Sequence, residues 1–145
     1  MKFTVEAVNI AVEKGVPKHE VPEIVCRANY GIEGDAHAGA WHRQVSLLAG
    51  EAVDAMKAKG LDLAAGAFGE NIVTRGVDWS QARVGEIIQI GEVELEITQI
   101  GKECHSRCAI YYAAGDCIMP SQGIFVTVRK GGTIHAQNSG DYHIR

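Results

Sequence analysis

The chain has 145 residues, of which 46% are hydrophobic and 22% are charged, and its formal net charge is −4. This length fits a single domain, residues 1–145, with a real hydrophobic core. The negative charge argues against nucleic acid or an anionic membrane as the main partner, because both reward clustered Lys and Arg. No apolar run approaches the roughly 20 residues that span a bilayer, and the N-terminal stretch lacks the apolar core of a signal peptide. The sequence therefore predicts a cytoplasmic protein.

The first part of the chain predicts two strands and a helix. Residues 2–13 (KFTVEAVNIAVE) are rich in valine and partly alternate between apolar and polar side chains, which is typical of a strand. Residues 43–49 form a compact apolar run that indicates another strand. Residues 50–60 predict a helix that ends at a glycine, with Val53 and Met56 on one face and charged side chains opposite.

The middle of the chain contains the clearest hairpin. Residues 69–76 are β-branched and bounded by glycines, so a short strand is expected there. Two alternating runs follow at 86–90 and 93–98, and the sequence predicts a tight turn between them at Gly91 and Glu92.

The last part predicts a helix, a second hairpin and a loose tail. Residues 107–115 (RCAIYYAAG) are expected to be helical and to end at a glycine. Residues 122–137 predict a hairpin that turns at Gly131 and Gly132. The tail, residues 138–145, is expected to be exposed to solvent because chain ends are often loosely held.

Short strands therefore dominate the predicted elements, and 17 glycines mark many turns between them. We predict a mainly β fold with inserted short helices. Its expected arrangement is a mixed, mainly antiparallel β-barrel.

The loop at residues 31–44, GIEGDAHAGAWHRQ, has little apolar content and many groups that bind ligands. Asp35 and His37 lie two positions apart among glycines that permit close backbone approach to a ligand. Arg43 can hold a phosphate or carboxylate through two parallel hydrogen bonds, and backbone N–H groups in glycine turns bind anions. The alternative is a polar loop in which Asp35 and His37 only satisfy turn hydrogen bonds.

A second group of reactive residue types lies in GKECHSRC, residues 101–108. Cys104 follows a predicted strand and has Lys102, His105 and Arg107 as basic neighbours. Cationic neighbours stabilise a thiolate, and a helix beginning near this point would add its N-terminal dipole. Cys104 is therefore a candidate for a nucleophilic or sulfur-carrying thiol.

The cysteines also allow two other interpretations. Cys104, His105, Cys108 and Cys117 together offer four soft metal ligands. Their spacing, however, matches none of the common paired zinc motifs. Cys108 and Cys117 also fit small buried thiols, and a reducing cytosol would leave all four cysteines of the chain, including Cys26, without disulfides.

The third candidate stretch is GAFGENIVTRG, residues 66–76, in which Asn71, Thr74 and Arg75 are polar. An amide beside the start of a strand serves either as a turn residue or as a hydrogen-bond partner for the edge of a ring. The chain carries no nucleophile elbow, Walker phosphate loop, His-Glu-x-x-His site or dinucleotide fingerprint.

Five motifs taken in chain order give the sequence a family resemblance. They resemble, in order and spacing, the MOSC domain, which is the C-terminal domain of molybdenum cofactor sulfurases and also occurs as small stand-alone bacterial proteins. The resemblance implies a mostly β, barrel-like fold and a role in handling the molybdenum cofactor. The motifs are GIEGDAHAG, RQVSLLAGEAV, GAFGENIVTRGVD, ARVGEIIQIGEVELEIT and GKECHSRC.

The resemblance also implies a role for one cysteine. MOSC domains are described as sulfur carriers, whose signature cysteine takes sulfane sulfur from a pyridoxal-phosphate cysteine desulfurase and delivers it to a metal–sulfur centre. Cys104 is the matching position, and it is also the expected molybdenum ligand. Relatives with a Cys-x-x-Cys pair use the second cysteine, so Cys108 competes with Cys104 here. Since the chain shows no site for pyridoxal phosphate, that cofactor is expected on a partner protein.

The resemblance further implies a pocket for a molybdopterin-type molybdenum cofactor. A pterin with a terminal phosphate needs an anion grip and hydrogen-bond partners for its ring edges. Arg75 is a secondary candidate for the phosphate, against an alternative as a solvated charge at a strand end. The family positions near the pocket correspond to Asp35, His37, Arg43, Glu51, Asn71 and Thr74.

Three other functions remain open from the sequence. The first is a molybdenum-dependent reductase of N-hydroxylated compounds, which would depend on separate redox proteins for electrons. The second is a non-catalytic module that binds the cofactor. The third is a structural zinc-binding β domain.

Overall fold

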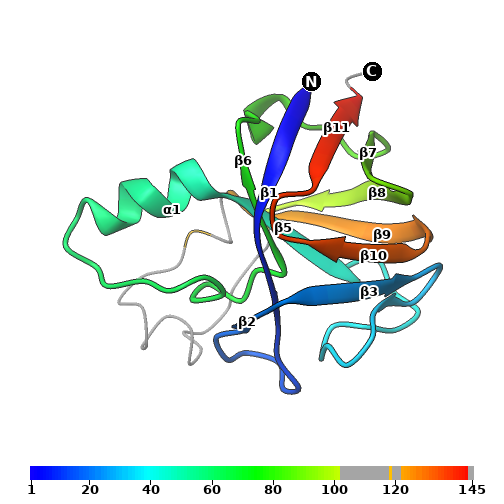
Figure 1. Cartoon of the computed structure of the whole chain (residues 1–145), viewed down its shortest axis with the longest axis horizontal. Coiled ribbons are helices and arrows are strands. Elements are labelled where there is room, and N and C mark those ends of the chain that lie inside the picture. Colours follow the sequence, from blue (N-terminus) through cyan, green and yellow to red (C-terminus); the bar gives the residue numbers. More distant parts are fainter. Residues whose placement is uncertain (102–117, 119–121, 144–145) are drawn as a thin grey trace.

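A computed structural model describes residues 1–101, 118 and 122–143. Eleven strands, one short α-helix and one 3₁₀ turn make up this part of the chain (Figure 1). In chain order the elements are β1 (Lys2–Ile10), β2 (His19–Val21), β3 (Glu23–Arg27), β4 (Gly31–Ile32), β5 (Val45–Ala49), α1 (Gly50–Lys57), β6 (Ile72–Arg75), η1 (Trp79–Gln81), β7 (Ile87–Ile90), β8 (Val93–Ile100), β9 (Ile124–Lys130), β10 (Gly132–His135) and β11 (Ser139–His143).

The larger sheet closes into a barrel. Its strand order is β11-β7-β8-β9-β5-β6-β1-β2. β11 also pairs with β1, which closes the strands from β11 to β1 into a ring and leaves β2 outside it. Among the described pairings only β5 and β6 run parallel, and the others are antiparallel. The predicted mixed, mainly antiparallel β-barrel is therefore confirmed. Figure 1 shows α1 lying to one side of the barrel and β1 and β11, the first and last described strands, next to each other.

Most of the predicted elements are present. The strand expected at 2–13 is β1, and its alternating side chains point in turn into the barrel and out to solvent. The predicted hairpin is formed by β7 and β8, which pair from Ile90 opposite Val93 and turn at Gly91 with a positive φ of 59°. The predicted helix is α1, which buries Val53 and Met56. The helix predicted at 107–115 lies outside the described residues.

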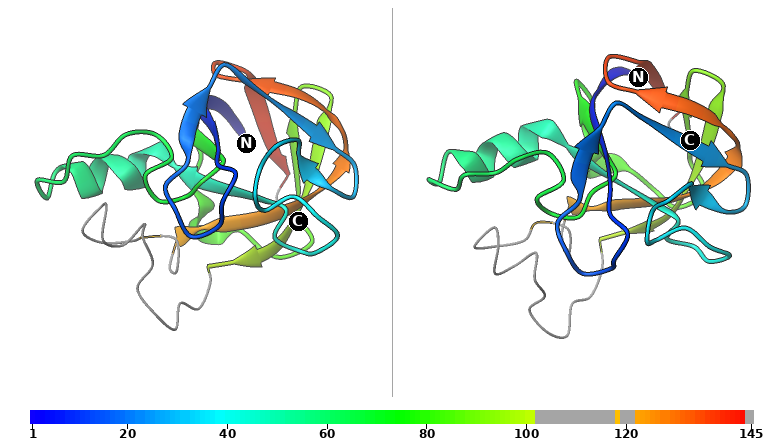
Figure 2. Two further views of the ribbon diagram at one scale, coloured as in Figure 1. Left: turned by 90° about the horizontal axis from the view of Figure 1, so that it is seen from below. Right: turned by 60° about the horizontal axis from the view of Figure 1, so that its bottom comes forward.

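The second predicted hairpin is wrong, although both of its strands exist. β9 has β8 on one edge and β5 on the other, so neither edge is free for β10. Instead β10 pairs with β3 in a separate sheet of order β10-β3-β4. The chain crosses to that sheet at Gly131, where a Cβ atom would lie 2.5 Å from the carbonyl oxygen of Cys26. Figure 2 shows β3 and β10 running side by side.

The tail is also not loose, contrary to the prediction. Residues 139–143 form β11, which pairs with β1 on one side and with β7 on the other. Tyr142 is fully buried, and its ring centroid lies 4.9 Å from that of Trp79. The end of the chain therefore closes the barrel, because both neighbouring strands would otherwise present an unpaired edge.

Two hydrophobic clusters stabilise the fold. The larger one fills the barrel with aliphatic and aromatic side chains from all of its strands. The smaller one lies between α1 and the outer face of the barrel and consists of Leu48, Val53, Met56, Leu63, Phe68, Ile118 and Phe125. Among the described residues, no helix combines the length and apolarity needed to cross a membrane.

A substitution in β11 tests the closure of the barrel. The Tyr142 hydroxyl donates a hydrogen bond to the buried carboxylate of Glu86, and burial raises the pKa of Tyr142 well above its usual value. Tyr142→Phe removes this donor, and we expect the free energy of unfolding to fall by about 1–3 kcal/mol in urea titrations. Tyr30→Phe is the matched control, because Tyr30 is 40% exposed. An equal effect of both substitutions would contradict the role given to Tyr142.

Candidate functional site

Residues 33–44, called here the site loop, are held between β1 and β8. The backbone N–H of Ala11, directly after β1, donates to Oδ1 of Asp35 over 3.1 Å. At the other end of the loop, Nε2 of His42 lies 2.8 Å from the side-chain oxygen of Gln99 in β8. The loop thus ends beside the strand that leads into the segment with Cys104.

Asp35 forms a buried ion pair with a lysine that the sequence analysis did not single out. Nζ of Lys18 lies 2.7 Å from Oδ1 of Asp35, and the two side chains are 1% and 0% exposed. The other oxygen of Asp35 accepts the backbone N–H of His37 over 3.1 Å. Nζ of Lys18 also lies 2.9 Å from Nδ1 of His37, so one ammonium group joins the two candidate residues of the loop.

The surroundings of Asp35 keep its carboxyl group ionised. Burial by itself would raise the pKa of Asp35, since it disfavours the charged form. The charge and hydrogen bond of Lys18, together with the backbone N–H groups of His37 and Ala11, outweigh burial, so the pKa of Asp35 lies well below its ordinary value.

Cationic side chains gather around the ring of Trp41. Nζ of Lys14 and Cζ of Arg43 each lie 4.7 Å from the centroid of the indole, within cation–π range. The His37 ring stacks on the same indole at a centroid distance of 6.2 Å, and Nε1 of Trp41 donates to the His37 carbonyl. We call these four residues the Trp41 cluster.

Arg43 is the member of the Trp41 cluster with spare binding capacity. It is half-buried, yet its Nε atom is buried without a hydrogen-bond partner among the described residues. Its guanidinium also lies 5.7 Å from the ring of Phe125, so two aromatic rings cover it. A buried N–H without a partner is costly, and an anion that accepted from it would remove the cost.

Asn71, predicted to contact the cofactor, is used inside the protein. It is fully buried, its Oδ1 accepts the backbone N–H of Ser46 over 3.0 Å, and its Nδ2 donates to the carbonyl of Asn9. These bonds tie together the segments that carry β1, β5 and β6. A role for Asn71 toward a cofactor stays a prediction, and the structure gives the side chain a framework role.

Three further predicted site residues lie near the start of α1. Oγ1 of Thr74 accepts from Nε1 of Trp79, and Oε2 of Glu51 accepts the Gly76 N–H over 2.8 Å. Arg75 bonds to the carboxylates of Glu6 and Asp54 at 2.6 and 2.7 Å. The structure therefore separates the predicted residues into two groups. Asp35, His37 and Arg43 lie in the site loop, whereas Glu51, Thr74 and Arg75 lie around the N-terminal end of α1.

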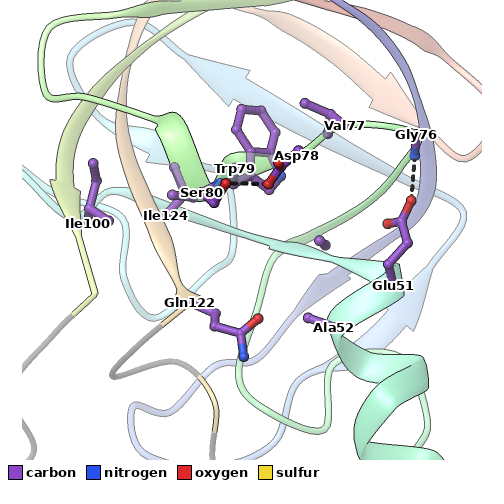
Figure 3. A pocket seen from close by; sticks show the side chains of 11 residues that line it. Glu51, Ala52, Gly76, Val77, Asp78, Trp79, Ser80, Ile100, Gln122 and Ile124 are labelled. Carbon is purple, nitrogen blue, oxygen red and sulfur yellow. Dashed lines mark hydrogen bonds between the residues drawn. The ribbon is translucent and has the colours of Figure 1, made fainter.

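A cavity of about 850 Å³ opens near this second group (Figure 3). Its charged lining residues among those described are Glu51 and Asp78, and no Lys, Arg or His is among them. Ile100 and Gln122 also line the cavity. In the sequence, Ile100 precedes and Gln122 follows the segment that carries the candidate cysteines. The two carboxylates of the described lining, after which we call it the acidic cavity, disfavour phosphate, and the cavity leaves room for a small neutral or cationic molecule.

Only one cysteine lies in the described part of the chain. Cys26 is buried in β3, and burial raises the pKa of its thiol to about 12. It is therefore protonated at neutral pH and is a poor nucleophile. Cys104, Cys108 and Cys117, together with the zinc ligands considered from the sequence, lie outside the described residues.

Sequence comparison decides the family. The model of the MOSC domain matches residues 34–139, which is most of the chain. The chain belongs to the MOSC domain family. This family is associated with the molybdenum cofactor, and the match begins within the site loop and runs into β11. No curated protein is significantly similar to the chain in sequence.

Solved structures agree with the MOSC fold. The YuaD protein of Bacillus subtilis superposes with a TM-score of 0.81 at 17% identity, over 100% of this chain and 97% of that protein. YiiM of Geobacillus stearothermophilus gives 0.74 at 18% identity over 99% and 76% of the two chains. YiiM of Escherichia coli gives 0.68 at 21% identity over 100% and 71%. At these identities the likeness supports the fold alone.

Three members of the site were not predicted from the sequence. Lys14 and Lys18 lie between β1 and β2 and contact the site loop only through folding, so no local motif contains them. Trp41 was visible inside the loop motif. An indole beside Arg43 and between two histidines was the available signal of a cation-rich surface.

The buried ion pair predicts a specific pH dependence. Asp35→Asn removes the carboxylate that lies 2.7 Å from the Lys18 ammonium, and at pH 7 we expect a loss of about 3–5 kcal/mol in the free energy of unfolding. Because the folded pKa of Asp35 is lowered, its contribution is complete above the unfolded value of about 4 and disappears as the pH falls below it. Urea titrations at several pH values should therefore show the difference between wild type and variant shrinking in acid. The exposed Asp62→Asn is the control, and a pH-independent difference would contradict the assignment.

Proposed function

We propose that this protein binds the phosphate end of a molybdopterin-type cofactor at the Trp41 cluster and carries sulfane sulfur on Cys104. The observation that carries the proposal is Arg43, whose buried Nε lacks a partner in the described part of the chain and whose guanidinium is held by Trp41 and Phe125. The chemistry of the described residues fits the cofactor, because Lys14, His37 and Arg43 offer donors and positive charge for a phosphate. Asp35 would act indirectly, by fixing the loop.

The place of Cys104 in the sequence supports the same function. Cys104 follows Ile100, the last residue of β8, by four residues, and a chain spans at most about 3.6 Å per residue, so the covalent chain allows a separation of at most about 14 Å. Both the site loop and the acidic cavity adjoin that end of the strand. A thiolate there would suit either persulfide chemistry or ligation of molybdenum, whose bound centre would supply redox chemistry.

The charging step uses a partner enzyme. The Cys104 thiolate attacks the terminal sulfur of a cysteine persulfide on a pyridoxal-phosphate cysteine desulfurase. A new S–S bond forms at Cys104, the S–S bond of the donor breaks, and the donor leaves as a thiolate. Delivery of that sulfur as sulfide to a metal–sulfur centre takes two electrons, which a thiol supplies by forming a disulfide with Cys104. Free thiols of this kind persist in the cytosol.

One observation favours a second function. A sulfur carrier does not require a large cavity for a small molecule, yet the structure has the acidic cavity beside the same strand end. A molybdenum-dependent reductase of N-hydroxylated compounds would use such a cavity for its substrate. It would hold the cofactor tightly, with Cys104 or Cys108 as the molybdenum ligand, and would receive electrons from separate redox proteins.

Cysteine variants separate these functions. We expect wild type incubated with a cysteine desulfurase and cysteine to gain one persulfide, which Cys104→Ser loses and Cys108→Ser keeps. Cys26→Ser is the control and should keep the persulfide. Burial raises the pKa of the Cys26 thiol to about 12, so this thiol should not react in the wild type. Mass spectrometry locates the persulfide, and metal and pterin analysis of the same proteins from a molybdate-fed host measures cofactor content.

The outcomes differ clearly. Near-stoichiometric molybdenum that one cysteine variant loses would favour the reductase, and a persulfide that only Cys108→Ser loses would move the carrier role to Cys108. Pterin retained by both variants without any persulfide would indicate a non-catalytic binding module. Stoichiometric zinc with unfolding by a chelator would indicate a structural zinc domain.

A substitution of Arg43 tests the phosphate site. Arg43→Gln removes the charged donor, and we expect the affinity for the pterin cofactor to fall about 10- to 100-fold, the range for one hydrogen bond to a charged group. Arg129→Gln removes an equal charge from an exposed residue of β9 and should leave affinity unchanged. Pterin fluorescence after release measures retention. Equal retention by the two variants would reject Arg43 as the phosphate ligand.

A further inference from the structure

The contact between Lys18 and His37 determines which ring nitrogen of His37 carries its proton. Nζ of Lys18 lies 2.9 Å from Nδ1 of His37 and 2.7 Å from Oδ1 of Asp35. An ammonium group can only donate hydrogen bonds, so a hydrogen bond at this distance requires a lone pair on Nδ1. The competing partner for Nδ1 is Oδ2 of Asp35, which is 3.7 Å away and too far for a hydrogen bond.

We propose that Lys18 is a positioning residue that holds His37 in the tautomer with its proton on Nε2. His37 then presents a hydrogen-bond donor to a ligand and is not available as a base at Nδ1. Nε2 has no hydrogen-bond partner among the described residues, and the side chain is 28% exposed, so a ligand can reach it. Lys18 and Asp35 approach Nδ1 of the ring, and Lys14 and Arg43 contact the Trp41 indole on which the ring stacks.

The backbone holds Lys18 in place independently of its charge. The Lys18 N–H donates to the carbonyl of Gly66 over 2.8 Å. Gly66 has a positive φ of 88°, and a Cβ atom there would lie 2.2 Å from the Lys18 carbonyl oxygen. The Glu70 carboxylate accepts the N–H groups of Gly66 and Phe68, which fixes that turn. The family motif GAFGENIVTRG therefore also supports the site loop, through Lys18.

The chemistry of the ligand follows from the donor and its surroundings. Lys14 and Arg43 contact the Trp41 indole on which His37 stacks, so a donor at Nε2 of His37 favours an acceptor that carries negative charge, such as a phosphate oxygen. That the occupant is the cofactor phosphate rests on the proposed function. The tautomer itself does not, because it depends only on Lys18, Asp35 and His37.

The experiment is a ¹⁵N NMR measurement of the histidine side chains in the ligand-free protein at neutral pH. In wild type we expect Nδ1 of His37 to be unprotonated and Nε2 to carry the proton. In Lys18→Met, Asp35 becomes the remaining partner, so we expect the proton to move to Nδ1 and the pattern of ring cross-peaks to change. Lys18→Arg retains a cationic donor and should keep the wild-type pattern. The exposed Lys57→Met is the control.

Two results would overturn the proposal. One is a proton on Nδ1 in the wild type, and the other is an unchanged His37 pattern in Lys18→Met. If Lys18→Met does not fold, the wild type still decides the question. A scalar coupling between Nζ of Lys18 and Nδ1 of His37 supports the proposal, and protonated Nδ1 rejects it.

Titration with inorganic phosphate separates this inference from the proposed function. We expect phosphate to shift the Nε2 resonance of wild type and to shift that of Lys18→Met much less. A wild-type tautomer as proposed, without any phosphate effect, would count against the phosphate site and leave the role of Lys18 intact.

Discussion

The pairing of β1 with β11 is the constraint on which the rest of the structure depends. It closes the barrel by joining the first and last described strands of the chain. The same strand β1 also pairs with β6, and its far end leads to Ala11, whose N–H binds Asp35. A closed barrel has no free edge along which β1 could shift, so the anchor of the site loop has a fixed place. Closure of the barrel and position of the site are therefore one property of the fold.

The buried pair of Lys18 and Asp35 has a cost as well as a benefit. Removing two charges from water is unfavourable, and their mutual attraction repays this only where hydrogen bonds satisfy the remaining groups. Here the backbone N–H groups of Ala11 and His37 donate to the carboxylate. The ring nitrogen Nδ1 of His37 accepts from the ammonium in the proposed tautomer. The interaction gives the loop one defined arrangement, which suits the ligand-binding role proposed for Arg43 and His37.

The two candidate regions differ in charge. The Trp41 cluster combines Lys14 and Arg43 with His37, whereas the described lining of the cavity contains Glu51 and Asp78. Phosphate and a neutral or cationic molecule would therefore be attracted to different places beside the end of β8. Under the proposed function, the cofactor phosphate and a small substrate would therefore bind at separate places.

The sequence by itself determined the elements whose signals are local, together with the family. Alternation defined β1, β7 and β8, and the apolar face of α1 was readable because its period is that of a helix. Only the tertiary structure decided which strands pair. The pattern of 122–137 could not show that β8 and β5 occupy both edges of β9, and the polar tail gave no sign that β1 and β7 need β11.

The same holds for the site. The motifs contained Asp35, His37 and Arg43, but Lys18, which contacts Asp35 and His37, comes from outside them. Asn71 is used in the framework. Neither could be predicted, because hydrogen-bond partners are set by contacts between segments and not by neighbours in sequence.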